Sequence, residues 1–161
     1  MDLILWRHAE ALELAADDLS EQSDFDRALT AKGERQAHRM AEWLNQRLAH
    51  STRILVSPAR RAQQTAKALD RNFKTVAALA PKGSAEDLIL AARWPEGSEP
   101  VLIVGHQPTL GLAAAQLLSG QGQAWAVKKG AVWWLRHRQR NVNEDGSGQV
   151  VLQVVQGPDF L

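Results

Sequence analysis

The sequence contains no cysteine, which excludes disulfide bonds and thiolate metal sites. No apolar stretch approaches the ~20 residues that a membrane-spanning helix needs. The first residues show no basic segment followed by a long apolar run, so we expect no signal peptide. These absences lead us to expect a cytoplasmic protein without a membrane partner.

A strong excess of one charge is also missing, because 19 Lys and Arg residues stand against 18 Asp and Glu residues. Proteins that bind nucleic acid usually carry a basic excess or a basic stripe, so we expect no nucleic-acid partner. There is no internal repeat and no low-complexity linker, and 161 residues lie within the usual size of one domain. We therefore predict a single domain over residues 1–161.

Metal-ligand spacing is absent as well. The histidines stand far apart in the sequence, without the short intervals of a local ligand set. They are His8, His38, His50, His106 and His137. We expect neither a metal nor another cofactor.

The sequence does contain three apolar, β-type runs that each lead to a cationic or imidazole side chain. The runs and their side chains are 3–6 with Arg7 and His8, 53–56 with Arg61, and 100–104 with His106. Ligand crevices in open α/β sheets lie at the carboxyl ends of the strands. An Arg-His dipeptide alone is common by chance. Cationic or imidazole side chains after three separate strands are less common, and together they predict one anion-binding site.

Helical patterns follow these strands. They cover 31–48, the segment after Ser57-Pro58, 85–94 and 108–118. Thr30 is a candidate N-cap, and Pro58 is a helix-start signal that puts Arg61 in the first turn. Helix N-termini attract anions, so an arginine there strengthens a phosphate site, although Arg60 or Arg61 taken singly also fits an exposed side chain.

The other segments carry weaker signals. Residues 12–26 are acidic and irregular, and we expect each acid, taken singly, to be solvated. A short strand is predicted over 75–79, and the runs 130–137 and 149–155 predict an antiparallel hairpin around a turn at 143–148. The basic group expected along a solvated edge of the hairpin consists of Arg136, Arg138 and Arg140, with His137.

The polar residues near the strand ends also occur in the order and spacing of a known family. The motifs are Arg7-His8-Ala9, Leu29-Thr30 with Gly33 and Gln36-Ala37, Ser57-Pro58 with Arg61-Ala62 and Gln64-Thr65-Ala66, and Val104-Gly105-His106. From residue 3 to about 115 the chain resembles the histidine phosphatase, or phosphoglycerate-mutase-like, superfamily. Its short length and the stretch from Arg7 to Ala11 are most similar to the small bacterial phosphohistidine phosphatases of the SixA type.

This resemblance implies an α/β fold, a three-layer sandwich with a mostly parallel central sheet and helices on both faces, followed by the C-terminal hairpin. It also implies that His8 is transiently phosphorylated and that Arg7, Arg61 and His106 bind the phosphoryl group. Arg27 occupies the place of an arginine that faces the pocket in SixA-type proteins. The implied enzyme is a phosphatase that needs no metal or cofactor.

The implied substrate is phosphohistidine on a phosphotransfer domain or a phosphocarrier protein. A small-molecule phosphomonoesterase and a non-catalytic phosphate-binding module are the alternatives. Many members of the superfamily carry a Glu or Asp general acid between the positions of Thr65 and Val101, yet residues 76–81 hold no acid, which leaves Glu86 and Asp87 as candidates. A phosphorylated imidazole can leave with a proton already on its other nitrogen, so a missing acid fits phosphohistidine.

Overall fold

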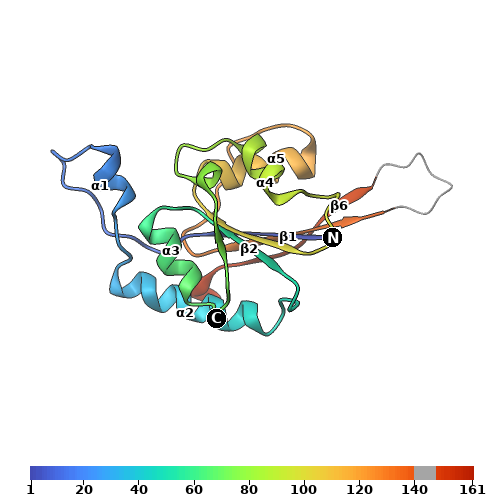
Figure 1. The fold of residues 1–161 in the computed structure, drawn as a ribbon, viewed down its shortest axis with the longest axis horizontal. Coiled ribbons are helices and arrows are strands. Elements are labelled where there is room, and N and C mark those ends of the chain that lie inside the picture. Colours follow the sequence, from blue (N-terminus) through green and yellow to red (C-terminus); the bar gives the residue numbers. More distant parts are fainter. Residues whose placement is uncertain (140–147) are drawn as a thin grey trace.

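A six-stranded sheet forms the middle of the molecule, with its strands in the order β3-β2-β4-β1-β5-β6 (Figure 1). The computed structural model describes residues 1–139 and 148–161. Strands β1 to β4 run parallel to one another, and β5 is antiparallel to both β1 and β6. The strand bounds are Asp2–Arg7 (β1), Arg53–Val56 (β2), Lys74–Thr75 (β3), Val101–Gly105 (β4), Val132–Arg138 (β5) and Gln149–Gln156 (β6).

Helices cover both faces of this sheet, so the predicted three-layer α/β sandwich is confirmed (Figure 1). The α-helices are α1 (Glu21–Phe25), α2 (Ala31–Asn45), α3 (Arg60–Lys67), α4 (Ala85–Ala92) and α5 (Thr109–Ser119), and the 3-10 helices are η1 (Ala77–Leu79) and η2 (Pro158–Phe160). Helices α2 and α3 pack in one apolar cluster, and α4 and α5 pack in the other. Among the described residues, no helix is long and apolar enough to cross a membrane.

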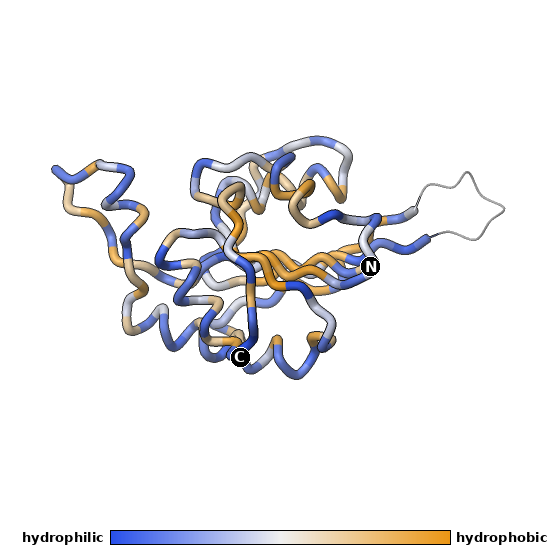
Figure 2. Tube along the Cα trace, in the orientation of Figure 1, coloured by the Kyte–Doolittle hydropathy of each residue, from blue (hydrophilic) through white to orange (hydrophobic). Residues whose placement is uncertain are grey.

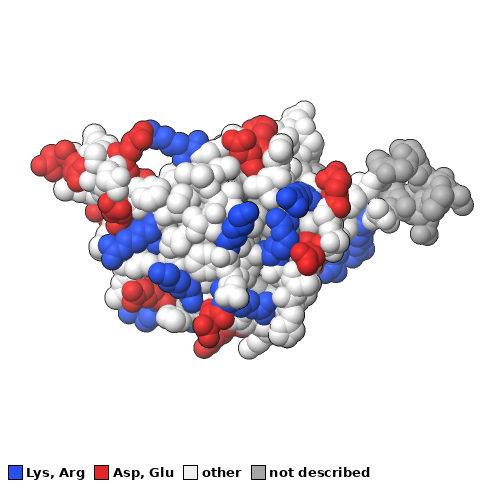
Figure 3. Space-filling view, viewed as in Figure 1, with Lys and Arg blue, Asp and Glu red and all other residues white. Residues whose placement is uncertain are grey.

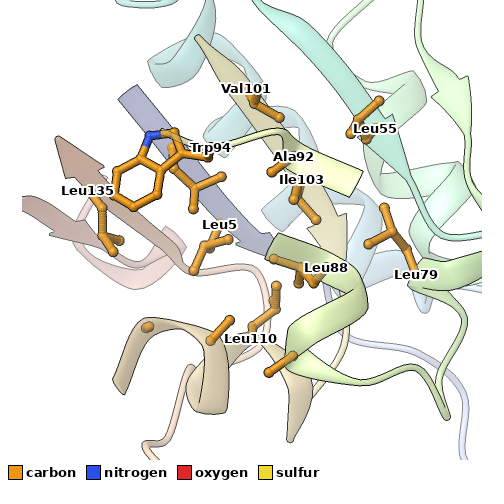
Figure 4. Close-up of a cluster of buried hydrophobic side chains, with 14 of the residues drawn as sticks. Leu5, Leu55, Leu79, Leu88, Ala92, Trp94, Val101, Ile103, Leu110 and Leu135 are labelled. Atoms are coloured by element: carbon orange, nitrogen blue, oxygen red, sulfur yellow. The ribbon is translucent and has the colours of Figure 1, made fainter. Parts of the chain in front are cut away.

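Strand β1 supplies both apolar layers, because successive side chains of a strand point to opposite faces. Leu3 and Leu5 join the cluster under α4 and α5, part of which Figure 4 shows around Leu88. Ile4 and Trp6 join the cluster under α2 and α3. All four β1 side chains are fully buried, and the hydropathy colouring places the most apolar part of the chain in the sheet (Figure 2). Packing from both sides therefore holds the end of β1 in a fixed position.

Helix α2 begins as the sequence predicts. The Thr30 hydroxyl accepts a hydrogen bond from the Gly33 amide at 2.9 Å, which satisfies one of the free donors of the first turn. The predicted apolar stripe, which includes Met40 and Leu44, is buried against the sheet. The helix ends at Asn45, three residues before the predicted Leu48, which is nevertheless buried in the same cluster.

Two predicted elements differ from the observed ones. Helix α3 begins at Arg60 rather than at Pro58, because the Ser57 hydroxyl accepts a hydrogen bond from the Ala59 amide and so forms a turn first. The predicted strand 75–79 is wrong beyond Thr75. The chain there turns into η1, which buries Leu79 in the cluster under α4 and α5.

Residues 12–26 form a projecting loop, and hydrogen bonds join the chain on its two sides. The amide of Leu12 donates to the carbonyl of Ala28 at 2.8 Å, and Ala11 bridges to Leu29. The segment was predicted to be irregular, but it contains the short helix α1, capped by Ser20. Acidic side chains gather on this projecting segment (Figure 3), so its charge lies on one extension of the molecule.

The antiparallel hairpin of β5 and β6 is confirmed, while residues 143–147 of its predicted turn at 143–148 lie outside the described residues, as does Arg140. The prediction of a basic outer edge is wrong. Arg136 and Arg138 lie on β5, between β1 and β6, and Arg136 makes a bidentate ion pair with Asp2 at 2.6 and 2.8 Å. The outer edge is β6, which carries no charged residue.

Candidate active site

Four predicted site residues converge at the carboxyl ends of the parallel strands. Arg7 ends β1 and His8 follows it, while Arg61 lies in the first turn of α3 and His106 follows β4. The rings of His8 and His106 have centroids 5.2 Å apart, and the Arg61 Nε lies 3.3 Å from the His8 Nε2. Adjacent parallel strands bring these residues together, because Arg7 is in register with Gly105. We call Arg7, His8, Arg61 and His106 the pocket residues.

The hydrogen bonds of His8 define its tautomer. Its Nδ1 lies 2.7 Å from the Ala9 carbonyl oxygen. A carbonyl oxygen accepts and does not donate, so Nδ1 carries the proton and Nε2 keeps its lone pair. The Nε–H of Arg61 donates toward that Nε2. The lone pair of His8 therefore points into the space between His8 and Arg61.

Burial makes both imidazoles poor bases. Burial first, and then the charges of Arg61, Arg7 and Arg27, lower the pKa of His8 to about 3, against the opposing hydrogen bond to Ala9. Burial, followed by His8 and the arginines, lowers the pKa of His106 to about 2. Both rings are neutral at neutral pH in the ligand-free site.

Arg7 is positioned by the loop that precedes β5. Its NH1 donates to the Val127 carbonyl at 2.9 Å, while its buried Nε has no hydrogen-bond partner among the described residues. The Gly130 amide donates to the His8 carbonyl at 3.0 Å. Gly130 has φ +74, a left-handed conformation that favours glycine at this close approach. The sequence carries no signal that residues 127–130 support the site.

His106 is held by Ser57, which lies directly after β2. The His106 Nε2 and the Ser57 hydroxyl are 2.7 Å apart, and the serine is fully buried. The other ring nitrogen, Nδ1, is buried, and residues 1–139 and 148–161 offer it no hydrogen-bond partner. Ser57 belongs to the motif that predicted helix α3, but its role beside His106 could be recognised only once β2 and β4 were known to be neighbours.

Thr65 links the turn at His8 to helix α3. Its hydroxyl accepts from the Ala9 amide at 3.1 Å and donates to the Arg61 carbonyl at 2.7 Å. Two motif glutamines act in the same way, since Gln64 accepts from the Leu29 amide. Gln36 accepts from the Glu10 amide. These polar side chains were recognised in the sequence as motif members, and the structure shows that they fix the backbone around the pocket residues.

An acid from the 12–26 segment also reaches Arg61. The NH1 of Arg61 donates to the Asp24 carbonyl oxygen at 2.7 Å, and its NH2 lies 3.3 Å from the Asp24 carboxylate. The other carboxylate oxygen accepts from the Arg27 Nε at 3.0 Å. Arg27 thus lies next to the pocket residues and contacts them through Asp24. The expectation of a solvated acid is wrong for Asp24, which is half-buried.

The two candidate general acids lie elsewhere. Glu86 and Asp87 are exposed in the first turn of α4, where the Asp87 amide donates to the Ser84 hydroxyl. Asp24 therefore is the carboxylate that the described residues bring to Arg61. Across residues 1–139 and 148–161, no three side chains of the types His, Cys, Asp and Glu gather as a metal site.

Comparison with known proteins shows the family of the chain. The model of the histidine phosphatase superfamily (branch 1) matches residues 3–82. A phosphohistidine phosphatase SixA homolog of Haemophilus influenzae is 35% identical over 132 residues, covering 73% of this chain and 77% of the relative. The chain belongs to the histidine phosphatase superfamily. It is a hydrolase of the phosphatase class.

Its likeness within the superfamily is to the SixA type. Phosphohistidine phosphatase SixA of Escherichia coli is 32% identical over 129 residues, covering 75% of this chain and 76% of the relative. A solved structure of the protein histidine phosphatase SixA with tungstate covers 99% of both chains with a TM-score of 0.75 and 26% identity. The phosphoglycerate-mutase-like fold predicted from the motifs is confirmed, hairpin included.

Proposed function

We propose that this protein, acting in the cytoplasm as one domain of residues 1–161, removes phosphate from phosphohistidine on a partner protein. Catalysis proceeds through a transient phosphate on His8. One observation carries the proposal: the His8 Nε2 is unprotonated and faces the Arg61 Nε at 3.3 Å, while the Ala9 carbonyl accepts the hydrogen bond that keeps the proton on Nδ1. A neutral, oriented imidazole among cations is what an attacking nitrogen needs.

The reaction has two steps. In the first, the Nε2 lone pair attacks phosphorus, and the bond from phosphorus to the substrate nitrogen breaks. In the second, water attacks the phosphorus on His8, the new N–P bond breaks, and inorganic phosphate leaves with loss of one proton from the water. His8 returns to its neutral form, so the enzyme is regenerated.

The remaining pocket residues stabilise the phosphoryl oxygens. Phosphoryl transfer relies mainly on positioning and on positive charge around the equatorial oxygens. Arg7 has a buried Nε without a partner and Arg61 lies beside the nucleophile, so both guanidinium groups supply donors that phosphate would satisfy. The unpartnered Nδ1 of His106 adds a further polar group.

The positions of Asp24, Glu86 and Asp87 favour phosphohistidine over an alkyl phosphate. An alkoxide leaving group needs a proton, and general acid catalysis contributes about 10²- to 10⁴-fold. Glu86 and Asp87 are exposed on α4, and both carboxylate oxygens of Asp24 accept from arginines. A leaving imidazole needs no such donor. We therefore assign a phosphotransfer domain or a phosphocarrier protein as the substrate.

A phosphatase of small phosphate esters is the second candidate. It is favoured by a cavity of about 310 Å³ beside Asp24, lined in part by Ser20, Phe25 and Lys82. That cavity has room for a small leaving group, and Asp24, which contacts Arg61, forms part of its wall. To choose between the two functions, the protein is given a phosphohistidine protein and a panel of phosphate monoesters. Equal or faster turnover of any monoester would contradict the phosphohistidine assignment.

The nucleophile is tested by trapping acid-labile phosphate on the protein during turnover. We expect labelling of the natural chain and none of the His8→Ala variant. The His38→Ala variant is the matched control, because His38 is an exposed histidine of α2, and it should label normally. Labelling that persists in His8→Ala would show that the nucleophile is another residue.

A further inference from the structure

The outer edge of the sheet, strand β6, is long and uncharged. Its eight residues read Gln-Val-Val-Leu-Gln-Val-Val-Gln, and Leu152, Val154 and Val155 are 38%, 37% and 52% exposed. Natural proteins usually protect an edge with charged side chains, proline or a very short strand. The opposite edge follows this rule, because β3 has two residues and one of them is Lys74. Strand β6 has none of these three protections, and it contains a β-bulge.

The backbone of β6 is available for pairing on its outer side. In the described part of the chain, residues 149–156 make backbone hydrogen bonds only in the ladder to β5. The donors and acceptors on the outer side thus have no protein partner among those residues. An edge of this kind binds another extended strand through its main chain.

The sequence of β6 reads almost the same in both directions. If a second copy lies antiparallel about a point between Leu152 and Gln153, Val150 faces Val155 and Val151 faces Val154. Residues that face one another in an antiparallel pair must point to the same side of the sheet. In a regular strand, residues five or three positions apart point to opposite sides, so this pairing would fail.

The β-bulge in β6 removes that obstacle. The ladder to β5 is interrupted between Trp134 and Leu135, where β6 contains one extra residue. As a result Val151 and Val154 oppose Arg136 and Trp134, which lie on the same side of β5. By the same register, Val150 and Val155 oppose His137 and Trp133, which share the other side. Both valine pairs therefore match across a two-fold axis.

We propose that two copies of this chain associate through antiparallel pairing of their β6 strands. The two sheets join into one continuous sheet, and because each copy contributes its β6 once, the assembly closes as a dimer. Strand β6 runs parallel to β1, so the two-fold axis turns the pocket residues of the two copies in opposite directions. Both pockets stay open. The self-matching, uncharged strand favours a second copy over an unrelated partner strand.

The dimer is tested by sedimentation velocity of the purified chain from about 5 µM to about 500 µM. An edge pairing buries less surface than the ~800 Å² per partner of a standard interface, so we expect the dimer to form toward the upper end of this range. A chain that remains monomeric throughout would overturn the proposal. An open series of larger species would do the same, because it contradicts closed pairing.

The register is tested with two double variants that differ in one residue. In V151E/V154E, glutamates face one another across the proposed axis, whereas V151E/V154K places a glutamate opposite a lysine in both symmetric pairs. We expect the first to weaken association at least tenfold and the second to restore it. Equal monomeric behaviour of the two variants, or dimers in both, would overturn the register. Circular dichroism and phosphatase activity per chain serve as folding controls, because neither residue is near the pocket residues.

Discussion

In the parallel half of the sheet, polar side chains are buried at the strand ends, whereas the hairpin exposes apolar ones. His8, Arg61 and His106 are 4%, 3% and 3% exposed, while Val155 of β6 is 52% exposed. Burying a polar or charged group costs free energy unless it finds partners. The pocket residues keep unmet polar atoms in spite of that cost, which points to a ligand. The hairpin exposes apolar surface, which points to a partner strand.

The largest expected effect separates two adjacent arginines of α3. Replacing a donor that stabilises transferred charge costs about 10²- to 10³-fold in rate, so Arg61→Ala should lower kcat/KM by about 10³-fold. Arg60→Ala should change it by less than about twofold, because Arg60 is exposed and Arg61 is buried beside His8. Steady-state kinetics with a phosphohistidine protein measures both. The reverse order would refute the alignment of the motif from Ser57 to Ala66, in which Arg61 is the phosphate-binding arginine.

A second contrast concerns acid stability. In the native state, the pKa of His8 is lowered to about 3 and that of His106 to about 2, so both rings stay neutral at mildly acidic pH. In the unfolded chain a histidine binds a proton below about pH 6.5. The unfolded state therefore gains protons first, and the free energy of unfolding falls as pH falls from about 6.5. Each buried histidine adds about 1.4 kcal/mol per pH unit to this slope.

The slope is measured by urea unfolding at several pH values between about 6 and 4. In the His106→Asn variant the slope of unfolding free energy against pH should be smaller by the contribution of one histidine, about 1.4 kcal/mol per pH unit. The carboxylates contribute equally in both proteins, so their part cancels when the slopes are subtracted. The His38→Asn variant, in which an exposed histidine of α2 away from the pocket residues is replaced, serves as the comparison. Identical slopes for all three proteins would mean that His106 is protonated in the native state.

Two nearly isosteric substitutions test the difference in burial between the parallel half of the sheet and the hairpin. Thr65→Val removes a buried hydroxyl that bonds both Ala9 and Arg61, so the free energy of unfolding should fall by about 1–3 kcal/mol. Val155→Thr makes the opposite exchange on the exposed face of β6 and should change it by less than about 0.5 kcal/mol. Thermal and urea denaturation measure both. Equal losses would abolish the distinction between the halves.

The smallest effect concerns the Asp24 carboxylate, which shares Arg61 with any bound phosphate. Because solvent reaches the Asp24 side and screens the pair, its contribution is about 1 kcal/mol or less, so Asp24→Asn should lower the inhibition constant of inorganic phosphate by about twofold to fivefold. Asp26→Asn is the control, because Asp26 is exposed and outside this contact. Weaker phosphate inhibition in Asp24→Asn would instead show that Asp24 holds Arg61 in place for the phosphate.

The strands and the pocket residues could be predicted because their signals are local. A continuous apolar run marks a strand buried on both faces, and the polar residue after it is placed at the sheet's carboxyl edge by that strand. Arg7, His8 and His106 follow from this pattern, whereas Arg61 was distinguished from Arg60 by the resemblance of its motif to the histidine phosphatase superfamily. The cap at Thr30 is equally local, since its partner is the amide of Gly33.

The supporting contacts could not be predicted because they join segments that are distant in sequence. Ser57 meets His106 across 49 positions, and Arg61 meets Asp24 across 37. The basic residues of the hairpin were misplaced for a related reason. Which strand of a hairpin forms the sheet's edge depends on the strand that it pairs with, and Arg136 and Arg138 lie on the one that pairs with β1.

The loop before β5 has a consequence for the order in which the protein becomes active. Trp6 Nε1 donates to the Gly130 carbonyl and Arg7 NH1 donates to the Val127 carbonyl, contacts that span 124 and 120 positions. A growing chain that carries His8 therefore lacks the support of its nucleophile until Gly130 has been synthesised. Contacts of such long range form slowly, because the chain must lose the entropy of closing a long loop before these contacts stabilise it. Folding itself thus delays activity until nearly the whole chain is in place.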